Sequence, residues 1–303
     1  MDEHQLKKPV RRLYVLAAIC LVALSRALGQ AVSLPEKHVI DRSSPPAASI
    51  CQNTTAPSQL KGAFRQVCLR KSAGTPDLIP GNAIVIGFVG GFVKHDDAKH
   101  PEVQFAAYLR NRYPSGFHSE VFSNHEGPEA LTWVLRLLDA DGDGTLSTEE
   151  KEQAKIIIYG HSWGASQTVT LARELGRNGI PVLLTIQVDI IAKFRQKGST
   201  IPPNVANAIN FYQPRGLLHG RSEILAADPK RTRILGNLRM TYEDHPINCD
   251  NYRWFARVFN KPHHEIENDP RVWDQAALLV DSQLSSRSAT TLASSPSKSQ
   301  LSK

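Results

Sequence analysis

Apolar residues occur along this chain in short runs that alternate with segments of helical spacing. Residues 83–89 form a nearly continuous apolar run that ends in Gly90 and Gly91. Such a run is typical of a β-strand that is covered on both faces. Further strands are predicted at 119–122, 155–159, 181–188 and 206–212, the last with the weakest pattern.

Other segments place apolar side chains three and four residues apart, which is the spacing of an amphipathic helix. Most of them lie between two predicted strands, and strands that are joined by a helical crossover run parallel. We therefore expect an α/β domain with a mostly parallel sheet and helices on both faces. The helices are predicted at 101–112, 128–138, 165–177 and 271–280.

The two ends of the chain differ from the part between them. Basic residues precede an apolar run at 13–24, and small residues follow, which is the pattern of a secretory signal peptide cut before Gln30. A helix of this length is only about 18 Å long, which is too short for the roughly 30 Å hydrocarbon core of a membrane. A cleaved signal peptide is therefore favoured, and a retained membrane anchor is the alternative interpretation. We expect a secreted or periplasmic protein with a signal peptide at 1–29, a folded domain at 30–280 and a disordered Ser/Thr-rich tail at 281–303.

Most of the net charge of +7 lies in these ends. Residues 1–29 hold five basic and two acidic side chains, and residues 281–303 hold three basic and one acidic. The domain between them is nearly neutral, which disfavours a nucleic-acid-binding surface. Membrane contact is expected only if the N-terminal segment is retained.

Three cysteines remain after removal of the signal peptide: Cys51, Cys68 and Cys249. An oxidising compartment favours disulfides, and three thiols permit three pairings. A bond between Cys51 and Cys68 closes the shortest loop, but the sequence leaves all three pairings open.

Residues 160–164 read Gly-His-Ser-Trp-Gly, a G-x-S-x-G sequence between a predicted strand and a predicted helix. In a strand–turn–helix unit of this kind, the serine is expected to occupy a strained turn that projects its hydroxyl above the sheet edge, and the glycines let the strand and the helix pack closely. This unit resembles the nucleophile elbow of the α/β-hydrolase family, which includes lipases and esterases, and the resemblance covers about residues 83–280. It implies an α/β-hydrolase fold in which Ser162 is the nucleophile of a catalytic triad.

A serine hydroxyl is a poor nucleophile at neutral pH, so a histidine must take its proton and a carboxylate must orient the histidine. The family carries these groups in the order serine, acid, histidine. Asp189 directly follows the predicted strand at 181–188, at the same sheet edge as Ser162, and is the expected acid. Asp228 is the alternative, since many family members carry the acid after the next strand.

The catalytic histidine of the family lies in a loop before the last helix, where this chain carries His263 and His264. Family members often read His-x-x-Ile there, which favours His263 and leaves His264 as the alternative. For the oxyanion, the resemblance implies N–H donors from Trp163 and from Gly91 or Phe92 in the loop after the first strand.

Residues 139–150 match the twelve-residue calcium loop of an EF-hand at every diagnostic position. Gly144 permits the sharp turn of that loop, and Leu146 is expected to pack inward. We expect a structural calcium ion that stabilises the segment leading to Ser162; a solvated acidic turn is the alternative. The expected ligands are Asp139, Asp141, Asp143, Thr145, Ser147 and Glu150.

These features together predict a secreted serine hydrolase that cleaves carboxylic esters through an acyl-enzyme on Ser162 and is stabilised by calcium. A small-molecule or lipid ester is the expected substrate. The alternative is a catalytically inactive calcium-binding protein on a hydrolase scaffold. His161 is expected to pack beside the turn, and residues 95–100, although rich in histidine and aspartate, are interpreted as a solvated loop because their spacing fits no transition-metal ligand set.

Overall fold

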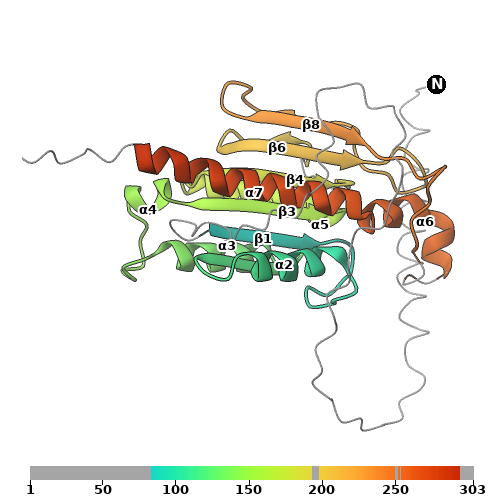
Figure 1. Cartoon of the computed structure of the whole chain (residues 1–303), viewed down its shortest axis with the longest axis horizontal. Helices are drawn as coiled ribbons and strands as arrows, with labels where there is room; N and C mark the ends of the chain where they lie inside the picture. Colours follow the sequence, from blue (N-terminus) through green and yellow to red (C-terminus); the bar gives the residue numbers. More distant parts are fainter. Residues whose placement is uncertain (1–82, 193–197, 250–251, 253, 294–303) are drawn as a thin grey trace, which may run out of the picture. The chain divides into compact units, whose positions relative to one another are not determined.

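A six-stranded parallel sheet forms the centre of the domain (Figure 1). The computed structural model describes residues 83–192, 198–249, 252 and 254–293. The strands are β1 (Ala83–Val89), β2 (Phe117–Ser123), β3 (Lys155–His161), β4 (Val182–Val188), β6 (Val205–Tyr212) and β8 (Arg233–Arg239). They lie in the order β2-β1-β3-β4-β6-β8, and each pairing is parallel. All five predicted strands are therefore present.

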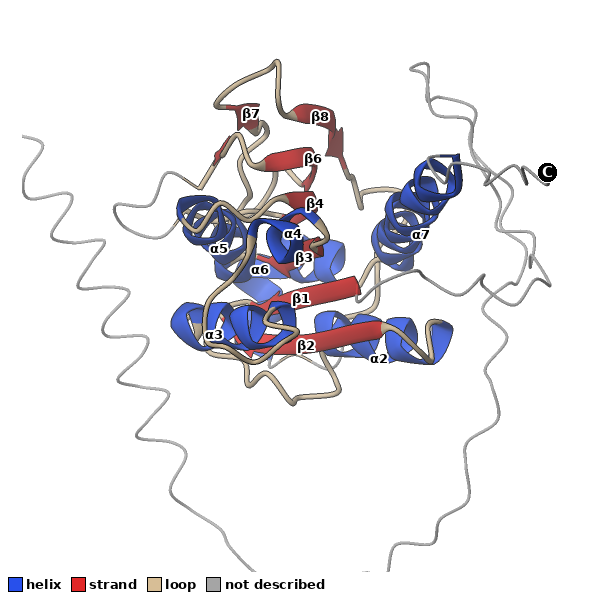
Figure 2. Ribbon diagram, turned by 90° about the vertical axis from the view of Figure 1, so that its left-hand side faces the viewer, coloured by secondary structure: helices blue, strands red, loops and turns tan. Residues whose placement is uncertain are grey.

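Helices cover both faces of this sheet (Figure 2). They are α2 (Pro101–Arg112), α3 (Gly127–Leu138), α4 (Thr148–Glu152), α5 (Trp163–Arg177), α6 (Trp254–Glu267) and α7 (Pro270–Ala293). Successive strand residues point to opposite faces, so Ile84 and Ile86 pack with α3 and α5, whereas Val85 and Tyr159 pack with α2 and α7. This arrangement confirms the predicted α/β architecture, a mostly parallel sheet with helices on both faces.

The edge strand β8 was not predicted. It reads Arg-Ile-Leu-Gly-Asn-Leu-Arg, in which glycine and asparagine are poor strand formers, and its residues are at most partly buried. A short parallel pair, β5 (Thr200–Ile201) with β7 (Leu225–Ala226), was not predicted either. Neither the edge strand nor the two-residue strands carry the apolar run or the alternation on which sequence prediction depends.

The C-terminal helix is longer than predicted. α7 includes residues 281–293, so the prediction that the chain is disordered from residue 281 is wrong for this segment. Asp281 lies 3.3 Å from a guanidinium nitrogen of Arg112 and accepts a hydrogen bond from the Tyr113 hydroxyl, and Leu284 is buried in the core. Contacts with distant residues hold a helix that the polar local sequence does not indicate.

Several predictions fall outside the described residues. Residues 1–82 contain the predicted signal peptide, Cys51 and Cys68, and residues 294–303 belong to the predicted tail. Cys249 is described and is buried. Within the described parts of the chain, no helix combines the length and the apolar character that a membrane span needs.

Candidate active site

Ser162 stands at a sharp turn between the end of β3 and the start of α5. Its backbone has φ 57° and ψ −121°, a region that residues other than glycine rarely adopt. Hydrogen bonds hold the turn: the Ser162 N–H donates to the carbonyl oxygen of Val188 at 2.9 Å, and the Ile191 N–H donates to the carbonyl oxygen of Ser162 at 3.2 Å. The predicted strained elbow is therefore present.

The two glycines of the elbow are required by close packing. A Cβ atom on Gly164 would lie 2.2 Å from the carbonyl oxygen of Phe88 in β1. A Cβ atom on Gly160 would lie 2.6 Å from a backbone carbon of Gly164. β1, β3 and α5 reach this separation only because both positions lack a side chain.

His263 faces Ser162, with its Nε2 atom 3.0 Å from the serine Oγ, and both residues are buried. The prediction that this histidine lies in a loop is wrong. α6 kinks at Asn260, which has the non-helical angles φ −130° and ψ 23°, and a second helical segment continues through His263 to Glu267. Pro262 fits this segment because proline is tolerated in the first turn of a helix.

Asp189 directly follows β4 and contacts the other nitrogen of the same ring. Its Oδ2 atom lies 2.6 Å from Nδ1 of His263, and its side chain is fully buried. The carboxylate also accepts two hydrogen bonds from Gln213, from its backbone N–H at 3.1 Å and from its side-chain Nε2 at 2.9 Å. The backbone N–H of Gly220 donates a third at 2.8 Å. These donors satisfy the buried carboxylate and fix the orientation of His263. Gln213 and Gly220 were not identified from the sequence, where no local pattern marks them.

The structure distinguishes between the alternatives that the sequence left open. Asp228 caps a turn between β7 and β8, where its Oδ1 accepts a backbone N–H two residues on at 3.0 Å. His264 has its Nδ1 3.6 Å from Oε2 of Glu267. Of the two candidate acids and two candidate bases, the structure brings Asp189 and His263 to the serine.

The predicted oxyanion donors lie at the ends of β1 and β3. Trp163 is the first residue of α5, so its N–H has no acceptor within the helix. A Cβ atom on Gly90 would lie 2.9 Å from Cβ of Ser162, which places the loop that carries Gly91 and Phe92 next to the serine. The strand order reverses between β1 and β3, and open α/β sheets bind ligands at such a position.

No protein-family model matches this sequence, and no curated protein matches it either. Similar solved structures include a hydrolase of the alpha/beta superfamily from Xanthomonas campestris pv. campestris, with 15% identity over 52% of this chain and 86% of that chain and a TM-score of 0.30. A cutinase-like protein from Cryptococcus sp. has 12% identity over 70% of this chain and 98% of that chain, with a TM-score of 0.34. A dienelactone hydrolase from Anabaena variabilis has 11% identity over 68% of this chain and 87% of that chain, with a TM-score of 0.36.

Aromatic side chains lie beside the serine. Phe92 is 81% exposed, and its ring meets the ring of Trp163 edge-on, with the centroids 5.6 Å apart. Ser162 itself is 8% exposed. Gln213 and Pro262 help to line a pocket of about 190 Å³, but its lining does not include the serine or the two aromatic residues. Aromatic surface therefore lies next to a serine that is itself largely buried.

The other histidines near the site have different surroundings. His161 packs beside the turn as predicted, with its ring centroid 4.5 Å from that of His263, and burial lowers the pKa of His161 to about 3. His95 is half exposed, as expected of a solvated loop. That interpretation is wrong for His100, which lies mostly buried with its Nδ1 2.7 Å from Oε1 of Glu267.

The predicted calcium loop, residues 139–150, lies between α3 and β3 and includes the start of the short helix α4. Carboxylate oxygens of Asp139, Asp141 and Asp143 lie within 4.8 Å of one another. Leu146 packs inward against the core, as predicted. Three of the six predicted ligands therefore converge.

The remaining predicted ligands lie on the same loop. Glu150 folds back across it, and its carboxylate accepts the N–H of Ala140 at 2.7 Å and the N–H of Ser147 at 2.8 Å. These hydrogen bonds lower the pKa of Glu150. Thr145 donates its N–H to Oδ1 of Asp143 at 2.7 Å. The loop therefore holds its acidic side chains in a compact arrangement around its own backbone.

Proposed function

We propose that the protein is a serine hydrolase that cleaves carboxylic esters through an acyl-enzyme on Ser162. One observation carries this proposal: the two nitrogens of the His263 ring lie 3.0 Å from Oγ of Ser162 and 2.6 Å from the carboxylate of Asp189. A ring in this position can take the hydroxyl proton, and the carboxylate beside it stabilises the imidazolium that forms.

In the first half of the reaction, Oγ of Ser162 attacks the ester carbonyl carbon while Nε2 of His263 takes the serine proton. Backbone N–H groups of Trp163 and of Gly91 or Phe92 stabilise the oxyanion, and the N-terminus of α5 favours negative charge at the same place. His263 then gives the proton to the departing alcohol oxygen as the carbon–oxygen bond breaks.

In the second half, water attacks the acyl-enzyme. His263 takes a proton from that water, the second tetrahedral intermediate uses the same oxyanion donors, and the proton returns to Oγ of Ser162 as the carboxylic acid leaves. Each protein group thus returns to its starting protonation state.

The surroundings of Ser162 support a small-molecule or lipid ester with an apolar acyl group. Phe92 and Trp163 offer aromatic surface next to the hydroxyl, whereas the low exposure of Ser162 favours short acyl chains over long ones. The pattern of residues 1–29 supports a secreted or periplasmic location for this activity.

Purified protein is expected to hydrolyse p-nitrophenyl acetate and butyrate, and to hydrolyse the palmitate ester more slowly, because the low exposure of Ser162 favours short acyl chains. The release of p-nitrophenolate measures these rates. A folded protein that hydrolyses none of these esters would instead favour the inactive calcium-binding protein on a hydrolase scaffold.

We also propose that residues 139–150 bind a structural calcium ion. The convergence of Asp139, Asp141 and Asp143 supports this, because a cation between the three carboxylates would offset their mutual repulsion. Thr145, Ser147 and Glu150 would supply the remaining oxygens. The bound ion would hold together the segment between α3 and β3, at the end of which Ser162 lies.

Removal of calcium by a chelator is therefore expected to lower the melting temperature. An ion present at about 100 times its Kd stabilises the folded state by about 2.7 kcal/mol, which corresponds to a shift of several degrees in a domain of this size. Thermal melts of the wild-type protein with calcium and with chelator measure the difference.

Two variants make this test specific. Glu150→Gln is expected to abolish the calcium-dependent shift, because it removes a carboxylate ligand. Glu149→Gln changes the neighbouring exposed glutamate and should retain the full shift. Equal melting temperatures of the wild-type protein with and without chelator would contradict the calcium proposal.

A further inference from the structure

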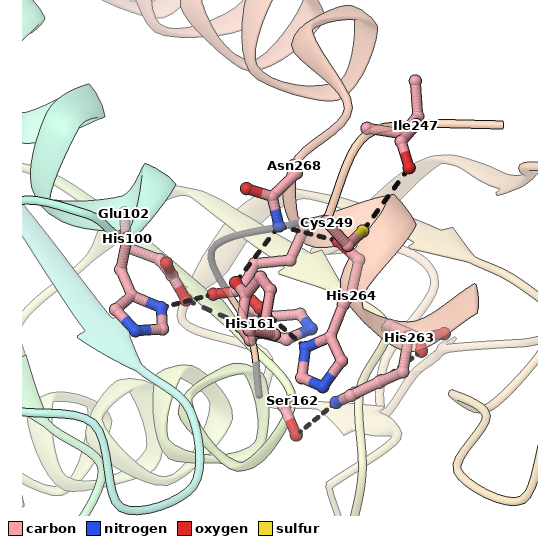
Figure 3. A network of polar contacts seen from close by, with 12 residues as sticks. His100, Glu102, His161, Ser162, Ile247, Cys249, His263, His264 and Asn268 are labelled. Carbon is pink, nitrogen blue, oxygen red and sulfur yellow. Dashed lines mark hydrogen bonds and ion pairs between the residues drawn. The ribbon is translucent and has the colours of Figure 1, made fainter. Parts of the chain in front are cut away.

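A second group of ionisable side chains lies beside the triad. Figure 3 shows His100, Glu102, His161 and His264 gathered next to the active-site serine and histidine. Together with Glu267, they come from the start of α2, the end of β3 and the end of α6. The proposed ester hydrolysis uses none of them.

Several polar atoms of this cluster are buried without a hydrogen-bond partner among the described residues. Glu102 is fully buried, and neither of its carboxylate oxygens has a hydrogen-bond donor among the described residues. Nδ1 of His264 is likewise buried and without such a partner in the described part of the chain. Burial and the nearby carboxylate of Glu267 raise the pKa of Glu102 well above its usual range. Since buried polar groups are normally satisfied, the cluster is arranged for a partner of another kind.

The distances within the cluster fit a shared metal ion. Nδ1 of His161 lies 3.6 Å from Oε1 of Glu102 and 3.6 Å from Oε2 of Glu267. These separations are too long for hydrogen bonds. Ligand atoms bound tetrahedrally about 2.05 Å from a zinc ion lie about 3.3 Å apart, so both distances from Nδ1 of His161 are close to the separation of two ligands on one ion.

Two further imidazoles border the same carboxylate. Nδ1 of His264 lies 3.6 Å from Oε2 of Glu267, and Nδ1 of His100 lies 2.7 Å from its Oε1. His100, Glu102 and Glu267 each offer a ligand atom within 4.8 Å of the others. The side chains of His100 and His264 are 14% and 16% exposed, so these two residues of the cluster reach solvent.

We propose that Glu102, Glu267 and His161 bind a divalent transition-metal ion such as Zn²⁺, with His100 or His264 as the fourth ligand. Imidazole and carboxylate ligands without thiolate suit zinc and its first-row neighbours. A cation between them would neutralise both buried carboxylates, and a complete set of protein ligands is typical of a structural site.

Such an ion would link three elements, α2, β3 and α6, behind the active-site histidine. It would not contact the ester, and the proposal does not depend on the proposed reaction.

The test uses the full-length protein, from which bound metal is first removed with a chelator. Excess calcium is then added to occupy the predicted calcium loop, residues 139–150. Titration with Co²⁺ is expected to give visible absorption bands of nitrogen and oxygen coordination that saturate at one ion per chain. Glu102→Gln is expected to weaken this binding by more than about 100-fold, since the loss of even an outer-shell partner costs roughly 10–100-fold. Zn²⁺ should displace Co²⁺ and raise the melting temperature of the wild-type protein but not that of Glu102→Gln.

Glu102→Gln should fold normally, because glutamine has almost the same size and shape as glutamate; its melting temperature in chelator checks this. Glu129→Gln, at an exposed position of α3, is the matched control and should bind Co²⁺ like the wild-type protein. The absence of stoichiometric Co²⁺ binding by folded wild-type protein would overturn the proposal. Unchanged binding by Glu102→Gln would overturn it equally.

Discussion

Replacement of Ser162 by alanine is expected to lower kcat for ester hydrolysis by about 10⁴-fold or more. The variant has no nucleophile at the elbow, so the acyl-enzyme cannot form and only the oxyanion donors and binding contacts remain. The fold should persist, because the strained turn is held by backbone hydrogen bonds that alanine retains. The rate of p-nitrophenyl butyrate hydrolysis at saturating substrate measures the effect.

Ser282→Ala provides the matched control for this variant. Ser282 is exposed on α7 and donates its hydroxyl to a backbone carbonyl of the same helix at 2.8 Å. This variant should retain the wild-type rate. If Ser162→Ala kept more than about one per cent of that rate, Ser162 would not be the nucleophile.

Asp189→Asn is expected to lower kcat by about 10⁴-fold, the effect seen when the equivalent acid of a serine protease is changed to the amide. The amide has almost the same shape, but it no longer stabilises the imidazolium of His263 and favours the wrong tautomer. Loss of the charge leaves the donors from Gln213 and Gly220 facing a weaker acceptor, so some loss of stability is expected as well.

The same substitution at the alternative acid separates the two candidates. Asp228→Asn keeps the side-chain oxygen that caps its turn, and should leave both kcat and the melting temperature close to those of the wild-type protein. A large loss of activity in Asp228→Asn together with a small loss in Asp189→Asn would show that the acid has been assigned to the wrong residue.

The central strands could be predicted from the sequence because burial on both faces leaves a continuous apolar run. β1, β3 and β4 are buried along their whole length. The elbow could be predicted because its chemistry is local: a glycine on either side of Ser162, a strand before it and a helix after it. Asp189 followed from topology, since carboxyl ends of parallel strands meet at one edge of the sheet.

The features that were missed depend on contacts between distant parts of the chain. α6 continues through His263 after a kink, and neither the kink nor the second helical segment shows in the apolar spacing. His100 and Glu267 are 167 positions apart, and only the packing of α2 against the end of α6 brings them together. Gln213 likewise binds the acid across the end of the sheet.

Treatment of the folded protein with a fluorophosphonate tests the central claim most directly, because this reagent reacts with a serine only where a base activates its hydroxyl. The account predicts one adduct per chain, located on Ser162 by mass spectrometry and absent from both Ser162→Ala and His263→Ala. A folded wild-type protein that remains unlabelled, or one labelled at a different residue, would contradict it.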